Sequence, residues 1–151
     1  MTSILKILHP TDLSDNSRAA LAAACEWAKH FGAELHLLHI VDGVTEPSPY
    51  LGVPFNECVT FEAMLRQRAR HTLDEWALPQ GSADLNVIRL LRSGSPVAHV
   101  VQYAQETGID LIVMGTHGRS GVSHLFLGSV AENVVRRAPC SVLTVRPAGA
   151  N

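Results

Sequence analysis

Several familiar sequence features are missing from this chain of 151 residues. No stretch approaches the roughly 20 apolar residues that cross a bilayer. The apolar run near the first residue is too short for a signal peptide, and Lys6 interrupts it. The three cysteines are far apart and form no C-x-x-C pair, which argues against a disulfide framework and a zinc knuckle. We therefore expect a soluble protein of the reducing cytoplasm, without a membrane partner.

Basic residues are too few and too scattered to follow a nucleic-acid backbone. Lys and Arg number 12 against 14 Asp and Glu, which gives a net charge of -2, and they form no basic stripe. The common catalytic signatures are also missing: there is no P-loop lysine motif, no G-x-S-x-G elbow and no H-E-x-x-H zinc motif. No nucleophile stands beside a recognisable base. We expect no nucleic-acid partner, no metal site and no dedicated catalytic centre.

The sequence does contain alternating apolar strands and amphipathic helices. Its 46% hydrophobic content supports one sizeable core, so we expect a single domain over residues 1–151. Strands are expected at 4–9, where Pro10 ends the run, and at 35–41, 85–91, 111–114 and 141–146. Helices are expected between the cap Ser14 and Gly32, over 61–76, between Ser95 and Gly108, and over 129–137. This alternation predicts an α/β fold with a mostly parallel sheet and helices on both faces.

A segment rich in proline and glycine follows the second expected strand. Residues 42–59 are broken by Gly43, Pro47, Pro49, Gly52 and Pro54. A loop of this length is unusual in a compact domain, and such loops often form lids or binding elements.

Two other loops carry the residues expected to form a site. His9-Pro10-Thr11-Asp12 follows the first strand, and Met114-Gly115-Thr116-His117-Gly118 follows the fourth. Doubly wound sheets bind ligands beyond the carboxyl ends of their strands, where the strand order reverses. If these two strands are neighbours, the loops face each other, and we place the site between them.

The second loop has glycines at positions suited to a phosphate. Gly115-x-x-Gly118 is followed after nine residues by Gly128-Ser129, immediately before an expected helix. Glycine permits a close backbone approach or a positive φ, and the start of a helix attracts anions. Arg119 adds a cation. Taken alone, the glycines also fit an ordinary turn, with Ser129 and Glu132 as a capping box.

The whole spacing resembles the G-2x-G-9x-G-(S/T) signature of the universal stress protein family, and it is complete here. Residues 4–12, 94–96, 110–115 and 139–145 are also similar to segments of that family. The resemblance implies an open, doubly wound, parallel sheet of five strands in the order 3-2-1-4-5. It further implies the family's ATP-binding branch, and hence ATP, with Mg²⁺, as ligand.

The resemblance also implies which residues contact the nucleotide. Adenine and ribose would lie against Pro10, Thr11, Asp12 and Val41. The phosphates would lie against Met114, Gly115, Gly118, Arg119, Gly128, Ser129 and Val130. Leu13 stands where other members have a glycine. The expected function is that of a nucleotide-responsive stress protein rather than a catalyst.

Two alternatives remain open at this point. One is a slow ATPase or phosphotransferase that uses Asp12 or His117, and the other is a nucleotide-free dimeric scaffold. In the strand order of the family, strand 141–146 lies at a sheet edge and is apolar for such a position. We expect it to form a homodimer by pairing with a second copy.

Overall fold

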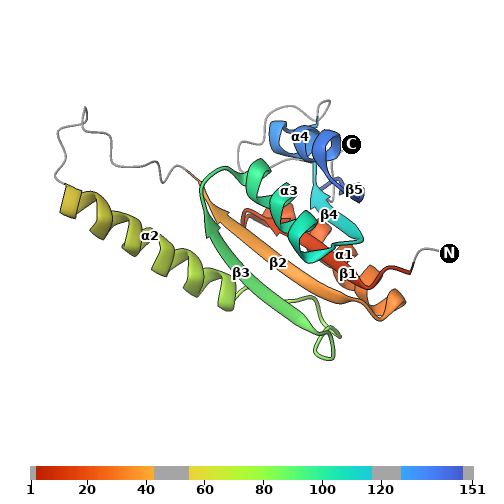
Figure 1. The fold of residues 1–151 in the computed structure, drawn as a ribbon. Helices are drawn as coiled ribbons and strands as arrows, with labels where there is room; N and C mark the ends of the chain where they lie inside the picture. Colours follow the sequence, from red (N-terminus) through yellow and green to blue (C-terminus); the bar gives the residue numbers. More distant parts are fainter. Residues whose placement is uncertain (1–2, 43–54, 117–126, 148–151) are drawn as a thin grey trace.

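The computed structural model describes residues 3–42, 55–116 and 127–147. The strands and helices of the described residues alternate along the chain as expected (Figure 1). The strands are β1 (Lys6–Thr11), β2 (Glu34–Val41), β3 (Val87–Ser93), β4 (Leu111–Gly115) and β5 (Ser141–Val145). The helices are the short 3-10 helix η1 (Asp15–Ser17), α1 (Arg18–Phe31), α2 (Phe55–Asp74), α3 (Pro96–Thr107) and α4 (Ser129–Arg137).

The five strands form one sheet in the order β3-β2-β1-β4-β5, and every neighbouring pair is parallel. This confirms the predicted fold class and strand order. The strand β3 lies at one edge of the sheet, and β5 lies at the other edge. The central strand β1 separates β2 from β4, which come from different halves of the chain.

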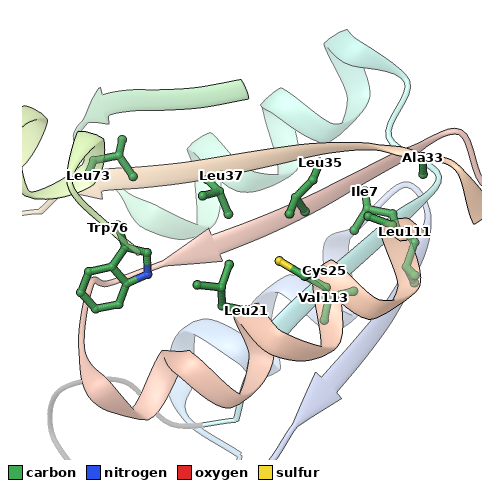
Figure 2. Packing of buried hydrophobic residues seen from close by; sticks show 12 residues of the cluster. Ile7, Leu21, Cys25, Ala33, Leu35, Leu37, Leu73, Trp76, Leu111 and Val113 are labelled. Carbon is green, nitrogen blue, oxygen red and sulfur yellow. The ribbon is translucent and has the colours of Figure 1, made fainter. Parts of the chain in front are cut away.

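Helices cover both faces of the sheet because the strands are apolar on both sides. Ile7 packs toward α1 and the end of α2, in a cluster that includes Trp76 (Figure 2). Leu8, the next residue along β1, packs toward α3 and α4. Both side chains are fully buried. Among the described helices, none is both long enough and apolar enough to span a bilayer.

Pro10 does not end the first strand as predicted. It lies inside β1, paired with Leu38 of β2, and the strand continues to Thr11. A proline in a strand costs only the hydrogen bond that its own N–H would have donated. The prediction was wrong because the strand can continue through its pairing with β2.

The start of the first helical region also differs from the prediction. Ser14 precedes η1 and not α1, and its side chain makes no capping bond. Its hydroxyl donates to Asp12 instead. The next two elements are shifted: α2 begins at Phe55 rather than at 61, and β3 occupies Val87–Ser93 rather than 85–91. Phe61 is 57% exposed, so apolar periodicity does not mark the first turns of α2.

Candidate functional site

The strand order reverses between β1 and β4, and the ladder of residue pairs between these two strands ends before their carboxyl ends. They pair at Ile7 with Leu111 and at Leu8 with Ile112. Both strands run on for three residues, but no further pair joins them. By contrast, β1 stays paired with β2 as far as Thr11. In this class of sheet, ligands bind in a crevice beyond the carboxyl ends of the strands at which the order reverses, which here are β1 and β4.

The loop after β1 is held by its own short polar side chains. Thr11 Oγ1 accepts a hydrogen bond from Leu13 N at 3.0 Å and lies 3.0 Å from Ser17 Oγ. Asp12 Oδ1 accepts from the backbone N–H of Ser14 at 3.0 Å and from its hydroxyl. Asp12 thus takes part in an Asx turn of the kind that fixes loops. Its Oδ1 atom has a structural role whether or not the carboxylate also meets a ligand.

Leu13 has a left-handed backbone, with φ at 59°. This conformation costs a residue with a Cβ roughly 1–2 kcal/mol, and Leu13 stands where the resemblance places a glycine in other members. Its side chain packs against the buried cluster under α1, which offsets part of that cost. Sparsely populated backbone conformations of this kind concentrate at binding loops.

Hydrogen bonds also hold the carboxyl end of β2, which lies at the same end of the sheet as the loop after β1. Val41 is largely buried, and its carbonyl accepts from Gly94 N at 3.0 Å. His39 Nδ1 donates to the carbonyl of Thr11 at 2.8 Å and so links β2 to the loop after β1. This role of His39 could not be predicted from the sequence, because the bond depends on the strand register.

The glycine loop is closed at its base by backbone hydrogen bonds. Thr116 N donates to the carbonyl of Val145 at 3.0 Å, and Gly128 N donates to the carbonyl of Thr116 at 2.7 Å. The second bond brings the start of α4 next to the end of β4. Gly128 is therefore held next to Thr116, the residue that follows Gly115.

The first turn of α4 differs from a capping box. Gly128, not Ser129, is the N-cap residue, and it has no side-chain capping bond. The capping-box alternative is therefore wrong. Gly128 has φ at -61°, which any residue adopts, so positive φ does not explain this glycine. The remaining explanation for a glycine here is that, without a Cβ, it would let a ligand approach the backbone closely.

The other expected contact residues differ in exposure. Met114 is buried, and its side chain belongs to the cluster between the sheet and helices α3 and α4. Ser129 and Val130 are exposed at the start of α4, and Pro10 is half-buried. Gly118, Arg119 and His117 lie outside the described residues, as does most of the segment 42–59.

His9 is a further residue of the crevice whose role the sequence did not predict. Its side chain is fully buried, and its Nδ1 atom lies 2.8 Å from the carbonyl oxygen of Val113 on β4. Burial is the main cause that lowers the pKa of His9, to about 4, against smaller opposing effects of Val113 and Asp12. The ring is therefore neutral at physiological pH and donates from Nδ1.

Within the described residues, no group of three His, Cys, Asp or Glu side chains is arranged to hold a metal. The described residues also form a partly open hollow of about 540 Å³, whose mixed lining includes the charged residues Lys29, Glu34 and Asp84. It lies at the amino ends of β1 and β2. Parallel α/β sheets bind ligands beyond the carboxyl ends of their strands, which is the opposite end of the sheet, so we do not assign the hollow to the site.

Comparison with known proteins identifies the family. The model of the universal stress protein family matches residues 4–146. A universal stress protein of Thermus aquaticus is 39% identical over 143 residues, which cover 93% of this chain and 97% of that protein.

Solved structures agree with this match. The structure of the hypothetical protein MJ0577 of Methanocaldococcus jannaschii is 28% identical, with a TM-score of 0.75 and coverage of 95% of this chain and 96% of that one. A universal stress protein in complex with cAMP is 24% identical, with a TM-score of 0.63 over 97% of this chain and all of that one, a likeness that shows the fold alone. With the family model matching nearly its whole length, the chain belongs to the universal stress protein family.

Proposed function

We propose that this protein binds ATP, with Mg²⁺, in the crevice between β1 and β4, and that it acts as a nucleotide-responsive regulatory or protective module in the stress response. The observation that carries the proposal is the complete glycine signature together with the bond from Gly128 N to Thr116 O. This bond holds Gly128, and with it Ser129, next to Thr116, which follows Gly115 at the end of β4. A family signature with its ends brought together there supports a phosphate site.

The residues present at the start of α4 fit a phosphate. Its first N–H groups have no side-chain cap, and Ser129 is exposed beside them. Uncapped N–H groups and the helix dipole favour an anion. Gly118 and Arg119 would complete the phosphate contacts, with the backbone of Met114 and with Val130. When bound, the nucleotide would place its negative phosphates beside these N–H groups and Arg119.

The loop after β1 would hold the nucleoside. Pro10, Thr11 and Val41 offer a largely buried and partly apolar wall for adenine, and Asp12 offers a carboxylate to the ribose or to a metal-bound water. Mg²⁺ usually keeps several waters and binds through phosphates and one or two carboxylates. The lack of a preformed three-ligand group among the described residues is compatible with that mode of binding.

Enzymatic activity is the second candidate, and it has less support. The sequence offers no P-loop lysine, and the Oδ1 atom of Asp12 is occupied by Ser14. Any ATP turnover should be far below the roughly 10 per second typical of enzymes. Fast turnover that Asp12→Asn or His117→Ala abolishes would favour the enzyme instead.

We also propose a cytoplasmic homodimer formed through β5. This strand lies at the sheet edge and pairs only with β4 among the described strands. Antiparallel pairing with a second copy would satisfy its outward N–H and C=O groups about a two-fold axis. The nucleotide-free scaffold predicts the same dimer, so the dimer alone does not support ATP binding.

Two glycine substitutions test the nucleotide site. In Gly118→Val and Gly128→Val a side chain would occupy the path of the phosphate, so titration with a fluorescent ATP analogue should show no saturable binding in either folded variant. Ala77→Val, an exposed substitution of similar size, is the control and should bind as the wild type does. Undiminished affinity in both glycine variants would remove the glycine loop from the site.

One proline substitution tests the dimer. The carbonyl of Val145 accepts from Thr116, so the backbone of Val145 faces the β4 side, and that of Val142, three residues earlier, faces outward. Val142→Pro should shift the protein from dimer to monomer in light scattering coupled to size exclusion. Val145→Pro would damage the sheet itself and is unsuitable. A wild-type monomer at high concentration would contradict the proposed dimer.

A further inference from the structure

The pairing of β1 with β4 stops at a point that the backbone directions explain. In a parallel ladder, the N–H and C=O of one residue point toward the same neighbouring strand, and successive residues alternate. The carbonyl of Leu5 accepts from Glu34 N of β2. The alternate residues of β1, Leu8 and Pro10 among them, therefore face β4.

The same reasoning gives the directions in β4. Thr116 N donates to Val145 of β5, so the even-numbered residues of this segment face β5. Val113 therefore faces β1. Since Leu8 is paired with Ile112, the next donor in the ladder to the carbonyl of Val113 would be the backbone nitrogen of residue 10. That residue is Pro10, which has no N–H.

The His9 side chain supplies the missing donor. Its Nδ1 atom lies 2.8 Å from the carbonyl oxygen of Val113, the acceptor that Pro10 leaves without a partner. Both residues are fully buried, so water does not reach this carbonyl from the surface. Since the carbonyl only accepts, the proton is on Nδ1, and His9 Nε2 has no partner among the described residues.

We propose that His9 is a positioning residue, which holds the carboxyl end of β4 at a fixed separation from β1 and so fixes where the glycine loop begins. A side-chain bond replaces the backbone ladder at the point where the strands must part. Met114 and Gly115 follow directly; they have no partner on β1 and are paired with Thr144 and Val145 of β5 on the other side. The part of this inference that concerns ATP rests on the proposed function, whereas the positioning of β4 does not.

The loss of this bond would leave a buried carbonyl without a donor. An unsatisfied buried group drives local rearrangement, because desolvation is no longer compensated. The end of β4 can reach a new donor only by moving, and Thr116 and the start of α4 would move with it through the Gly128 bond.

Two variants of His9 and one control separate positioning from general stability. In His9→Leu the donor is lost, and in His9→Asn the side-chain amide can donate from about the position of Nδ1. Tyr103→Phe is the control, because it removes a different buried hydrogen bond, to His36 on the other face of the sheet. Amide hydrogen exchange and titration with the fluorescent ATP analogue are measured on the whole chain for all three.

The amides of Met114, Gly115 and Thr116 should exchange at least about tenfold faster in His9→Leu than in the Tyr103→Phe control. The affinity for the analogue should fall by about tenfold or more in His9→Leu, and His9→Asn should restore both to near wild type. Equal exchange at these amides in His9→Leu and the control would overturn the proposal, as would failure of His9→Asn to restore them.

The outcomes also distinguish the two proposals. If the wild type binds no nucleotide, the proposed function fails, and the exchange data alone decide the role of His9. If His9→Leu is too unstable to isolate, comparison of the wild type with His9→Asn still decides it. Equal protection in these two supports the proposal, and faster exchange in His9→Asn contradicts it.

Discussion

Acid should destabilise this protein through His9, and the size of the effect follows from the structure. The fully buried ring has its pKa lowered from the ordinary value of 6.5 to about 4. A pKa difference of one unit corresponds to about 1.36 kcal/mol. Complete protonation of His9 in the unfolded chain therefore lowers the free energy of unfolding by about 3 kcal/mol. This is a large part of the stability of a small domain.

The sign of the effect follows from which state binds the proton. Above pH 6.5 the imidazole is neutral in both states, and His9 adds no pH dependence. Between pH 6.5 and about 4, only the unfolded chain takes up the proton, so the free energy of unfolding falls as the pH falls. Below about 4 both states are protonated, and the loss is complete.

Urea unfolding at a series of pH values tests this prediction, with Trp76 as the buried fluorescent reporter. Between pH 7 and pH 4.5 the wild type should lose about 2.5 kcal/mol more than His9→Asn, which does not titrate there. His71→Ala is the control, because the His71 side chain is 72% exposed, and its curve should follow the wild type. Parallel curves for the wild type and His9→Asn would refute the reasoning.

Two further predictions concern stability. Tyr103→Phe should lower the free energy of unfolding by about 1–3 kcal/mol, because the Tyr103 hydroxyl lies 2.6 Å from His36 Nδ1 in the core; an unchanged urea midpoint would contradict this. Gly94→Ala should cost about 1–3 kcal/mol in thermal unfolding, because φ is 126° and a Cβ would lie 2.8 Å from His99 Nε2. Adding His99→Ala to the Gly94→Ala chain should restore only the part of the lost stability that is due to the contact with His99. Complete restoration would show that the backbone at residue 94 is not strained.

The fold was largely predictable, because its main signals are local. Apolar runs such as 35–41 are long enough to be strands, and Gly32 marks the end of α1 where predicted. The strand order came from the family resemblance, since periodicity does not determine which strands are neighbours. The errors fall where tertiary contacts decide: Pro10 continues in β1 because β2 pairs with it, and α2 begins in turns whose side chains are exposed.

The site was predictable only in part. The glycine spacing is visible in the sequence, and the structure brings Gly115 and Gly128 together, but the roles of individual residues depend on register. His9 is one of eight histidines in the chain, and its bond to Val113 follows only when β1 and β4 are aligned. His39 is a second case of the same kind. A histidine directly before a strand proline is the signal that could have indicated the role of His9, but only if Pro10 had been recognised as part of the strand.

The central claim is that this chain binds ATP at the crevice between β1 and β4. The most direct measurement is isothermal titration of Mg²⁺-ATP into the folded wild-type protein after bound nucleotide has been removed, with cAMP as the competing ligand. We predict saturable binding of one ATP per chain, tighter than that of cAMP. No saturable binding of ATP by the folded protein, or binding of cAMP in preference to it, would contradict the account.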